Sequence, residues 1–307
     1  RPRRSPHQAV AKAEQFMNKY GLTHVVDMDL SKCFDTLDHE LIIEAVAEKI
    51  SDGSVLNLIK AFLKSGVLQD GNFSETTVGS PQGGVISPLI SNIYLNKFDQ
   101  KMMAKGIRIV RFADDILIFA KDKQTAGNYG KYATKILEEE LKLTVNKDKT
   151  KTTSIHEGVE FLGFIIYTKW VTVNPKRVKR FKDKIRDKTK RNTGISMEDI
   201  IKNLNPLLRG WINYYRIANI KTLIRDLMGW IRRRLRMIKI RHWKTYKGMH
   251  KEMRKQGIQG SGERMSMRKW KNSNVYIIHM LLPNKFFDDL GLINLTNYEV
   301  GLLSNYY

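Results

Sequence analysis

The chain has only one cysteine, Cys33, among its 307 residues. A single thiol excludes a disulfide framework and any Cys-rich zinc module, and it fits a protein of a reducing cytosol. Long apolar runs are also missing and no signal peptide opens the sequence, so we expect no membrane partner. No internal repeats are visible, which excludes a repeat architecture.

Acidic residues are scarce in only one part of the chain. Residues 1–168 hold 22 Lys and Arg against 21 Asp and Glu, whereas residues 169–307 hold 32 against 10. The net charge of +23 therefore comes almost entirely from the second part. A charge of this size predicts a polyanionic partner. With 42% hydrophobic residues, the chain can build two or three cored parts, and we expect a near-neutral catalytic part followed by a basic, nucleic-acid-binding part.

Two adjacent carboxylates, Asp114 and Asp115, stand between two apolar runs, 107–112 and 116–120. The runs predict a β-hairpin with the acids at its turn. Adjacent aspartates repel each other and are costly to bury, so we expect a cation between them. Oxygen-only ligands favour a hard metal, Mg²⁺ or Mn²⁺. For an isolated Asp-Asp pair, a solvated turn would be the more common explanation.

A third carboxylate follows an upstream strand. Residues 24–30 read His-Val-Val-Asp-Met-Asp-Leu, a run of β-branched and apolar residues that leads into acids. A period of two puts Asp27 and Asp29 on the same face, so periodicity leaves open which acid binds metal and which is structural. Between strand and hairpin, residues 79–89 predict a Pro- and Gly-rich turn that lets backbone approach a ligand closely, with a helix beginning near Ser87.

In this order the segments resemble the conserved blocks of a reverse transcriptase, most closely those encoded by bacterial group II introns. Residues 29–35 resemble the first catalytic block, residues 81–84 the Pro-Gln-Gly turn, and residues 112–115 the aromatic-x-Asp-Asp block. The other matching blocks are residues 1–9, 143–151 and 161–164. The resemblance implies an α+β fold: a right-hand polymerase palm with an antiparallel sheet, flanking helices and partial fingers, then an α-helical thumb and a small C-terminal segment.

The resemblance also implies an activity, RNA-directed DNA polymerisation by two-metal nucleotidyl transfer that needs no protein nucleophile. Its substrates would be dNTPs, an RNA template and a DNA primer. The resemblance makes Asp29, Asp114 and Asp115 the catalytic acids, and Asp27 becomes a strand-end residue. The implied metal-binding residues are Asp29, Leu30, Asp114 and Asp115.

Two further sites follow from the same resemblance. The implied nucleotide pocket comprises Leu30, Ser31, Lys32, Cys33, Phe34, Gln82 and Lys149, and the implied primer grip comprises Phe161, Leu162, Gly163 and Phe164. Phe34 would block a 2′-hydroxyl and so favour dNTPs, Gln82 would line the pocket, and Lys149 would support phosphate or template. Without the family, Phe34 reads equally as a core residue and Lys149 as part of a solvated turn.

The basic part predicts helices that carry interleaved aromatic and cationic residues. One helix is expected over residues 175–191, a second is expected to start near Ser196, and Pro206 marks a break or a new start. We expect RNA or DNA contacts from Arg177, Lys179, Arg180, Arg209, Arg232, Arg233, Arg234, Arg236 and Lys244. Trp211, Tyr214, Trp230 and Leu235 are more typical of a helical-bundle core. The region also resembles the thumb, or maturase-specific region, of group II intron proteins, which implies binding of structured intron RNA and assistance to its splicing.

The expected division of the chain is into three parts. Residues 1–168 would form partial fingers and palm, residues 169–245 a helical thumb or maturase domain, and residues 246–307 a basic C-terminal segment, a candidate for DNA binding. No His/Cys cluster like that of the nuclease domain in some relatives is present. The chain opens without Met inside the second conserved block, so we expect the N-terminal finger segment to be missing and residues 1–307 to bind nucleic acid but polymerise poorly.

Three functions remain open at this point. The favoured one is an RNA-directed DNA polymerase of a mobile intron that also assists splicing, in the bacterial cytoplasm with the nucleoid or its ribonucleoprotein. The second is an RNA-binding maturase with little polymerase activity. The third is a reverse transcriptase of a retron or defence system, which shares the palm but not the region around Gly210–Tyr215.

Overall fold

The computed structural model describes residues 4–64, 67–69, 72–74, 78–79, 86–191, 194–243, 245–255 and 276–307. The chain forms two compact units, Arg1–Val171 with Ser304–Tyr307, and Thr172–Leu303. The predicted turn at residues 80–85 and Lys244 lie outside the described residues. No helix in the described part of the chain is long and apolar enough to cross a membrane.

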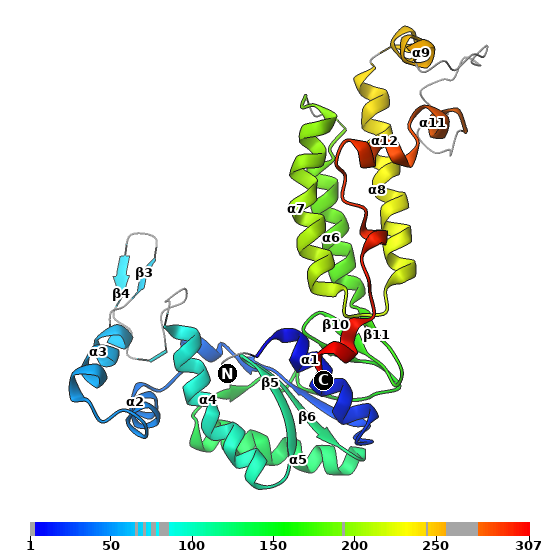
Figure 1. Cartoon of the computed structure of the whole chain (residues 1–307). Helices are drawn as coiled ribbons and strands as arrows, with labels where there is room; N and C mark the ends of the chain where they lie inside the picture. Colours follow the sequence, from blue (N-terminus) through cyan, green and yellow to red (C-terminus); the bar gives the residue numbers. More distant parts are fainter. Residues whose placement is uncertain are drawn as a thin grey trace. The chain divides into compact units, whose positions relative to one another are not determined.

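The first unit is built around a four-stranded antiparallel sheet with the strand order β5-β6-β1-β8 (Figure 1). Its strands are β1 (His24–Met28), β5 (Arg108–Phe112), β6 (Asp115–Ala120) and β8 (Lys151–Ser154). Five of the six residues of β6 are buried because this strand lies between two others and both faces of the sheet are covered.

Different helices cover the two faces of this sheet. Phe16 of α1 (Pro6–Asn18) packs edge-on against Phe119, with ring centroids 5.3 Å apart. On the other face, α5 (Lys123–Lys135) comes so close that a Cβ atom at Gly130 would lie 3.7 Å from Val26. Since Val25 pairs with Phe119 and Val26 with Ile118, alternation puts Asp27, Asp29 and Asp115 on the α1 side. The acids therefore lie on the face opposite the α5 core.

The remaining elements of the first unit complete this core and extend it. The helix predicted near Ser87 is α4, which begins at that residue. The other elements are β2 (Leu30–Ser31), the 3₁₀ turn η1 (Cys33–Asp35), α2 (His39–Ala47), α3 (Gly53–Lys64), β3 (Val67–Gln69), β4 (Asn72–Ser74), α4 (Ser87–Ala104), the π-helical turn η2 (Ile136–Glu140), β7 (Thr144–Val145), β9 (Val159–Phe161), β10 (Phe164–Ile166) and the 3₁₀ turn η4 (Leu302–Tyr306).

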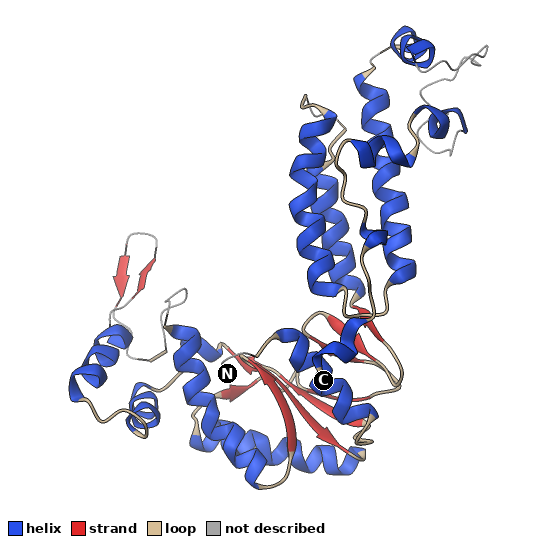
Figure 2. Ribbon diagram, viewed as in Figure 1, coloured by secondary structure: helices blue, strands red, loops and turns tan. Residues whose placement is uncertain are grey.

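The second unit is mainly helical (Figure 2). It follows β11 (Val171–Val173) and consists of α6 (Pro175–Lys188), α7 (Met197–Tyr215), α8 (Lys221–His242), α9 (Tyr246–Lys255), α11 (Tyr276–Leu281), α12 (Asn284–Asp289) and the 3₁₀ turn η3 (Leu295–Asn297). The side chains of Asn174 and Ser196 accept hydrogen bonds from the first turns of α6 and α7, as expected for N-caps. An antiparallel sheet with flanking helices, followed by a helical unit, confirms the α+β class.

The predicted break at Pro206 is wrong. Proline lacks an N–H donor and so was expected to end the helix, but α7 continues for nine residues beyond Pro206. Leu204 and Leu208, on either side of it, have no exposed surface, and Trp211 is 8% exposed. Tertiary burial of this face outweighs the local penalty for proline in a helix.

Candidate active site

The hairpin that carries Asp114 and Asp115 is confirmed. Strand β5 ends at Phe112, β6 begins at Asp115, and these two residues pair across the turn. Ala113 adopts the left-handed conformation, with φ of 54°, which costs an L-residue about 1–2 kcal/mol. A strained two-residue turn therefore presents the two acids, and its neighbours must hold it in place.

Arg111 supplies that support. Its Nε and Nη2 donate to the two carboxylate oxygens of Asp99 on α4, at 2.8 and 2.7 Å. Its Nη1 donates to Asn92 Oδ1 at 3.1 Å and to the carbonyl oxygen of Ala113 at 2.9 Å. The side chains of Arg111 and Asp99 are each only 7% exposed. One buried guanidinium thus ties the turn to α4.

Asp29 follows β1 directly. The last pair in the register is Met28 with Ile116, so the next position places Asp29 opposite Asp115. The Asp29 carbonyl accepts from the Asn146 N–H at 2.9 Å. Lys149 Nζ lies 3.3 Å from Asp29 Oδ2. The structure therefore brings Lys149, predicted to support phosphate or template, directly beside a predicted catalytic acid.

Electrostatic effects show that the acids are neighbours. Burial raises the pKa of Asp27 to about 6, opposed by Lys151 and assisted by Asp115 and Asp29. Burial also raises the pKa of Cys33 to about 12, with the Asp114 charge as the second cause. Asp115 therefore lies close enough to raise the pKa of Asp27 on β1, and Asp114 close enough to raise that of Cys33 in the first block.

Replacing Asp27 with Asn is expected to make stability less dependent on pH. The pKa of Asp27 is raised from 3.8 to about 6 in the folded chain, so the folded state binds more protons than the unfolded state between these values. Wild-type stability therefore falls as the pH rises through this window. Asp27→Asn should be more stable than wild type at pH 7, and the difference should vanish below about pH 4. Urea unfolding in EDTA measures this.

The control for this experiment is Asp148→Asn, which removes an exposed acid in the nearby loop. This variant should not reproduce the gain in stability that Asp27→Asn shows at pH 7. An Asp27→Asn variant that is less stable than wild type at pH 7 would contradict the prediction.

The acids have the right chemistry for a divalent cation but do not form a closed site. Among the described residues, no three His, Cys, Asp or Glu side chains converge as a ready-made metal site. Carboxylate oxygens on one sheet face nonetheless match the ligands of a hard cation. Leu30 pairs with Val145 and buries its side chain, so only its backbone carbonyl is suited to metal contact.

The predicted nucleotide pocket begins immediately after Asp29. Lys32 has a left-handed φ of 48°, Cys33 is buried and Phe34 is half-buried in η1. Ser31 pairs with Thr144. Gln82 lies outside the described residues, so its place in the nucleotide pocket stays a prediction.

Sequence reasoning did not single out Gly79 as a contact of the first block. Its φ is 90°, and a Cβ atom there would lie 2.5 Å from the carbonyl oxygen of Asp35. The Gly79 N–H donates to Leu37 O at 2.8 Å, and Gly79 O lies 2.7 Å from His39 Nε2. Gly79 is thereby fixed against Asp35 of the first block and against Leu37 and His39, which follow it. The only signal in the sequence was the glycine itself.

Gly79→Ala is expected to destabilise the first unit more than Gly21→Ala does. Both glycines have positive φ, but a Cβ atom at Gly21 meets nothing within 4 Å. The Gly21 variant should lose only the conformational term of about 1–2 kcal/mol, whereas the Gly79 variant must also move backbone. Urea unfolding of the two variants gives the difference, and equal losses would show that the close approach to Asp35 has no energetic weight.

The predicted primer grip is the β9–β10 hairpin. Phe161 and Phe164 pair across its turn, and both are buried. Leu162 and Gly163 both have positive φ, at 49° and 85°, which is typical of a tight hairpin turn. Contact with a primer would therefore come from the turn, because the two phenylalanines belong to the core.

The predicted nucleic-acid contacts of the second unit fall into two groups. Exposed side chains are those of Arg177, Lys179, Arg180, Arg209 and Arg233, and Arg234 is half-buried. Arg232 and Arg236 are only 7% and 6% exposed. Arg232 Nη2 donates to Asp288 at 2.9 Å, and Arg236 donates to Leu282 O and Asn284 Oδ1. In this structure the two side chains hold the segment around α12, so nucleic-acid contact by Arg232 and Arg236 stays a prediction.

Comparison with known proteins gives two family matches. Residues 1–166 match the family model described as reverse transcriptase (RNA-dependent DNA polymerase). Residues 178–257 match the model described as group II intron, maturase-specific domain.

Individual proteins are similar to parts of the chain. Protein YkfC of Escherichia coli (strain K12) is 32% identical over 200 residues, which cover 53% of this chain and 52% of that protein. Group II intron-encoded protein LtrA of Lactococcus lactis subsp. cremoris is 36% identical over 111 residues, 36% of this chain and 18% of LtrA. A solved structure of apo telomerase from Candida Tropicalis aligns over 91% of this chain and 50% of the telomerase chain, with a TM-score of 0.49 and 13% identity. This similarity is too remote to bear on function. The chain spans about half the length of YkfC.

Proposed function

This chain belongs to the reverse transcriptase (RNA-dependent DNA polymerase) family, and from that premise we propose that it copies RNA into DNA for a mobile group II intron. The reaction joins a primer 3′-hydroxyl to the α-phosphate of a dNTP and releases pyrophosphate. The observation that carries this proposal is the braced hairpin turn that presents Asp114 and Asp115, with Asp115 on the sheet face that also bears Asp29.

We assign the roles of individual side chains as follows. Asp29, Asp114 and Asp115, with the Leu30 carbonyl, would hold Mg²⁺ or Mn²⁺. Bound there, the cations would activate the primer hydroxyl and stabilise the leaving group. Lys149, 3.3 Å from Asp29, would move to phosphate when a nucleotide enters. Phe34 would exclude a 2′-hydroxyl, Gln82 would line the pocket, and the turn at Leu162 and Gly163 would hold the primer.

In this proposal three parts of the chain have separate roles. Residues 1–168 act as palm with partial fingers, residues 169–245 as thumb, and residues 246–307 as a basic segment for target DNA. The setting would be the bacterial cytoplasm, in a complex with intron RNA.

Primer extension tests the polymerase activity. The longest natural form of the protein is incubated with Mg²⁺, dNTPs and a DNA primer on an RNA template, and extended primer is expected. A protein that binds the primer–template but never extends it would contradict the proposal.

A second function, assistance to splicing of a group II intron, is favoured by one observation. Residues 178–257 match the maturase-specific domain, and the described cations Arg177, Lys179, Arg180, Arg209 and Arg233 are exposed. Tight binding to one structured intron RNA, together with accelerated splicing, would support this role. Polymerisation without selective intron binding would instead favour a retron or defence enzyme.

A further inference from the structure

We propose that a cavity formed by the residues that follow α6 and by one side of α8 binds a phosphodiester group of a nucleic-acid strand. Its volume is about 170 Å³ and it lies within the second unit. It is lined by Thr189, Arg191, Trp230, Arg233, Arg234 and Met237. The proposal rests on the proposed nucleic-acid function and names the chemical group that this part of the protein holds.

Positive charge converges on this cavity around a tryptophan. Lys182 Nζ lies 5.8 Å from the Trp230 ring centroid, and the guanidinium carbons of Arg186 and Arg234 lie 5.5 and 5.4 Å from it. An aromatic ring allows cations to gather in this way. Burial, followed by the charges of Arg186 and Arg191, lowers the pKa of Arg234. The cluster therefore carries mutual repulsion that an anion would relieve.

Arg234 is held in a fixed orientation. Its Nε donates to Thr189 Oγ1 at 2.7 Å and its Nη2 to Thr189 O at 2.9 Å. The Thr189 hydroxyl is in turn bound to Ile185 O at 2.6 Å. These bonds leave Nη1 of Arg234 without a hydrogen bond to any described residue. A pre-positioned guanidinium with a free edge is suited to a phosphate oxygen.

A purely structural explanation covers only part of this arrangement. Arg234 Nη2 caps the carbonyl oxygens of Arg186 and Thr189 at the end of α6, and its Nε bond to the Thr189 hydroxyl fixes it there. It does not explain Arg191 and Arg233, which are exposed and form no ion pair with a described residue. The nearby acids are already engaged, because Asp183 pairs with Arg186 and Asp187 lies 4.0 Å from Lys190. Two cations beside a fixed third thus have no counterion among the described residues.

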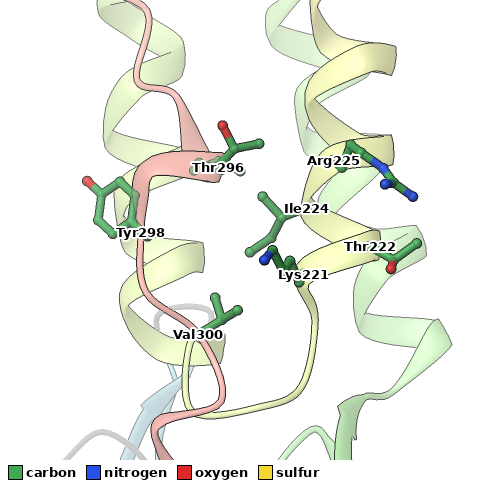
Figure 3. Close-up of a pocket in the computed structure, with 8 residues that line it drawn as sticks. Lys221, Thr222, Ile224, Arg225, Thr296, Tyr298 and Val300 are labelled. Atoms are coloured by element: carbon green, nitrogen blue, oxygen red, sulfur yellow. The ribbon is translucent and has the colours of Figure 1, made fainter.

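A second cavity, also within the second unit, lacks this convergence and provides the control (Figure 3). It lies between α8 and the segment around η3 and includes the apolar side chains of Ile224, Leu295 and Val300. Figure 3 shows the Arg225 side chain directed away from that segment. Arg225 and Lys221 are exposed cations on the same helix α8, so replacing them removes an equal charge elsewhere.

The test compares two double variants, Arg191→Gln/Arg233→Gln at the cavity and Lys221→Gln/Arg225→Gln as the control. All four side chains are exposed, so both variants should keep the wild-type circular dichroism spectrum. Binding is measured by fluorescence anisotropy over a range of salt concentrations, with a labelled DNA primer on an RNA template and with a structured group II intron RNA. The two probes distinguish the primer–template from the intron as the source of the phosphate.

We expect the cavity variant to bind at least one probe on the order of tenfold more weakly than the control variant, with its salt slope reduced by about one to two. Equal affinities and slopes for the two variants would overturn the cavity proposal while leaving nucleic-acid binding intact. A wild-type protein that binds neither probe would overturn the proposed function, and the cavity proposal with it.

Discussion

Asp115→Asn is expected to reduce RNA-templated DNA synthesis by about 10³-fold while leaving the fold intact. Asn has nearly the same shape as Asp but no charge, and the substituted residue lies at the exposed start of β6. The loss should therefore come from weakened cation binding and from poorer stabilisation of charge in the transition state. Single-nucleotide extension of a DNA primer on an RNA template measures it.

The matched control is Asp122→Asn, just beyond the other end of the same strand. Asp122 accepts a hydrogen bond from the Thr125 N–H as the N-cap of α5, and Asn is an equally good N-cap. Extension by this variant should equal that of wild type. An Asp115→Asn variant that extends primers at more than about a tenth of the wild-type rate would remove Asp115 from the catalytic group.

Local pattern predicted the elements that present the acids. The β-hairpin around Asp114, the strand before Asp29 and the start of α4 at Ser87 are all confirmed. Each depends on residues a few positions apart, so alternation, turn residues and capping were sufficient to identify them. Alternation could not decide whether Asp27 or Asp29 binds metal, because it puts both acids on the same face.

The features that sequence reasoning missed depend on partners far away in the chain. Arg232 and Arg236 looked like parts of a basic surface, but their partners are residues of 282–288, which periodicity does not link to α8. The close approach of Gly79 to Asp35 was missed for the same reason, because these two residues are also far apart in the chain. The Pro206 prediction failed because buried side chains on α7 outweighed a local rule.

Arg111→Lys is expected to lower both stability and the rate of primer extension. Lysine keeps the charge, but it cannot bind both oxygens of Asp99 and also reach Ala113 O. Each buried acceptor that loses its donor costs about 1–3 kcal/mol. Ala113, with φ of 54°, should then relax, and Asp114 and Asp115 should lose their fixed positions. Because misplaced catalytic groups lose rate steeply, we expect kcat to fall by about tenfold or more and the Mg²⁺ requirement to rise.

The control is Arg108→Lys, the same chemical change at an exposed residue of the same strand. Extension is measured well below the melting temperature of each variant, with the Mg²⁺ concentration varied, so that loss of folded protein is separated from loss of metal binding. If Arg111 only stabilises the fold, kcat per folded molecule and the Mg²⁺ requirement should match those of Arg108→Lys. If it positions the turn, both should change, because its Nη1 donates to the carbonyl of the residue directly before Asp114.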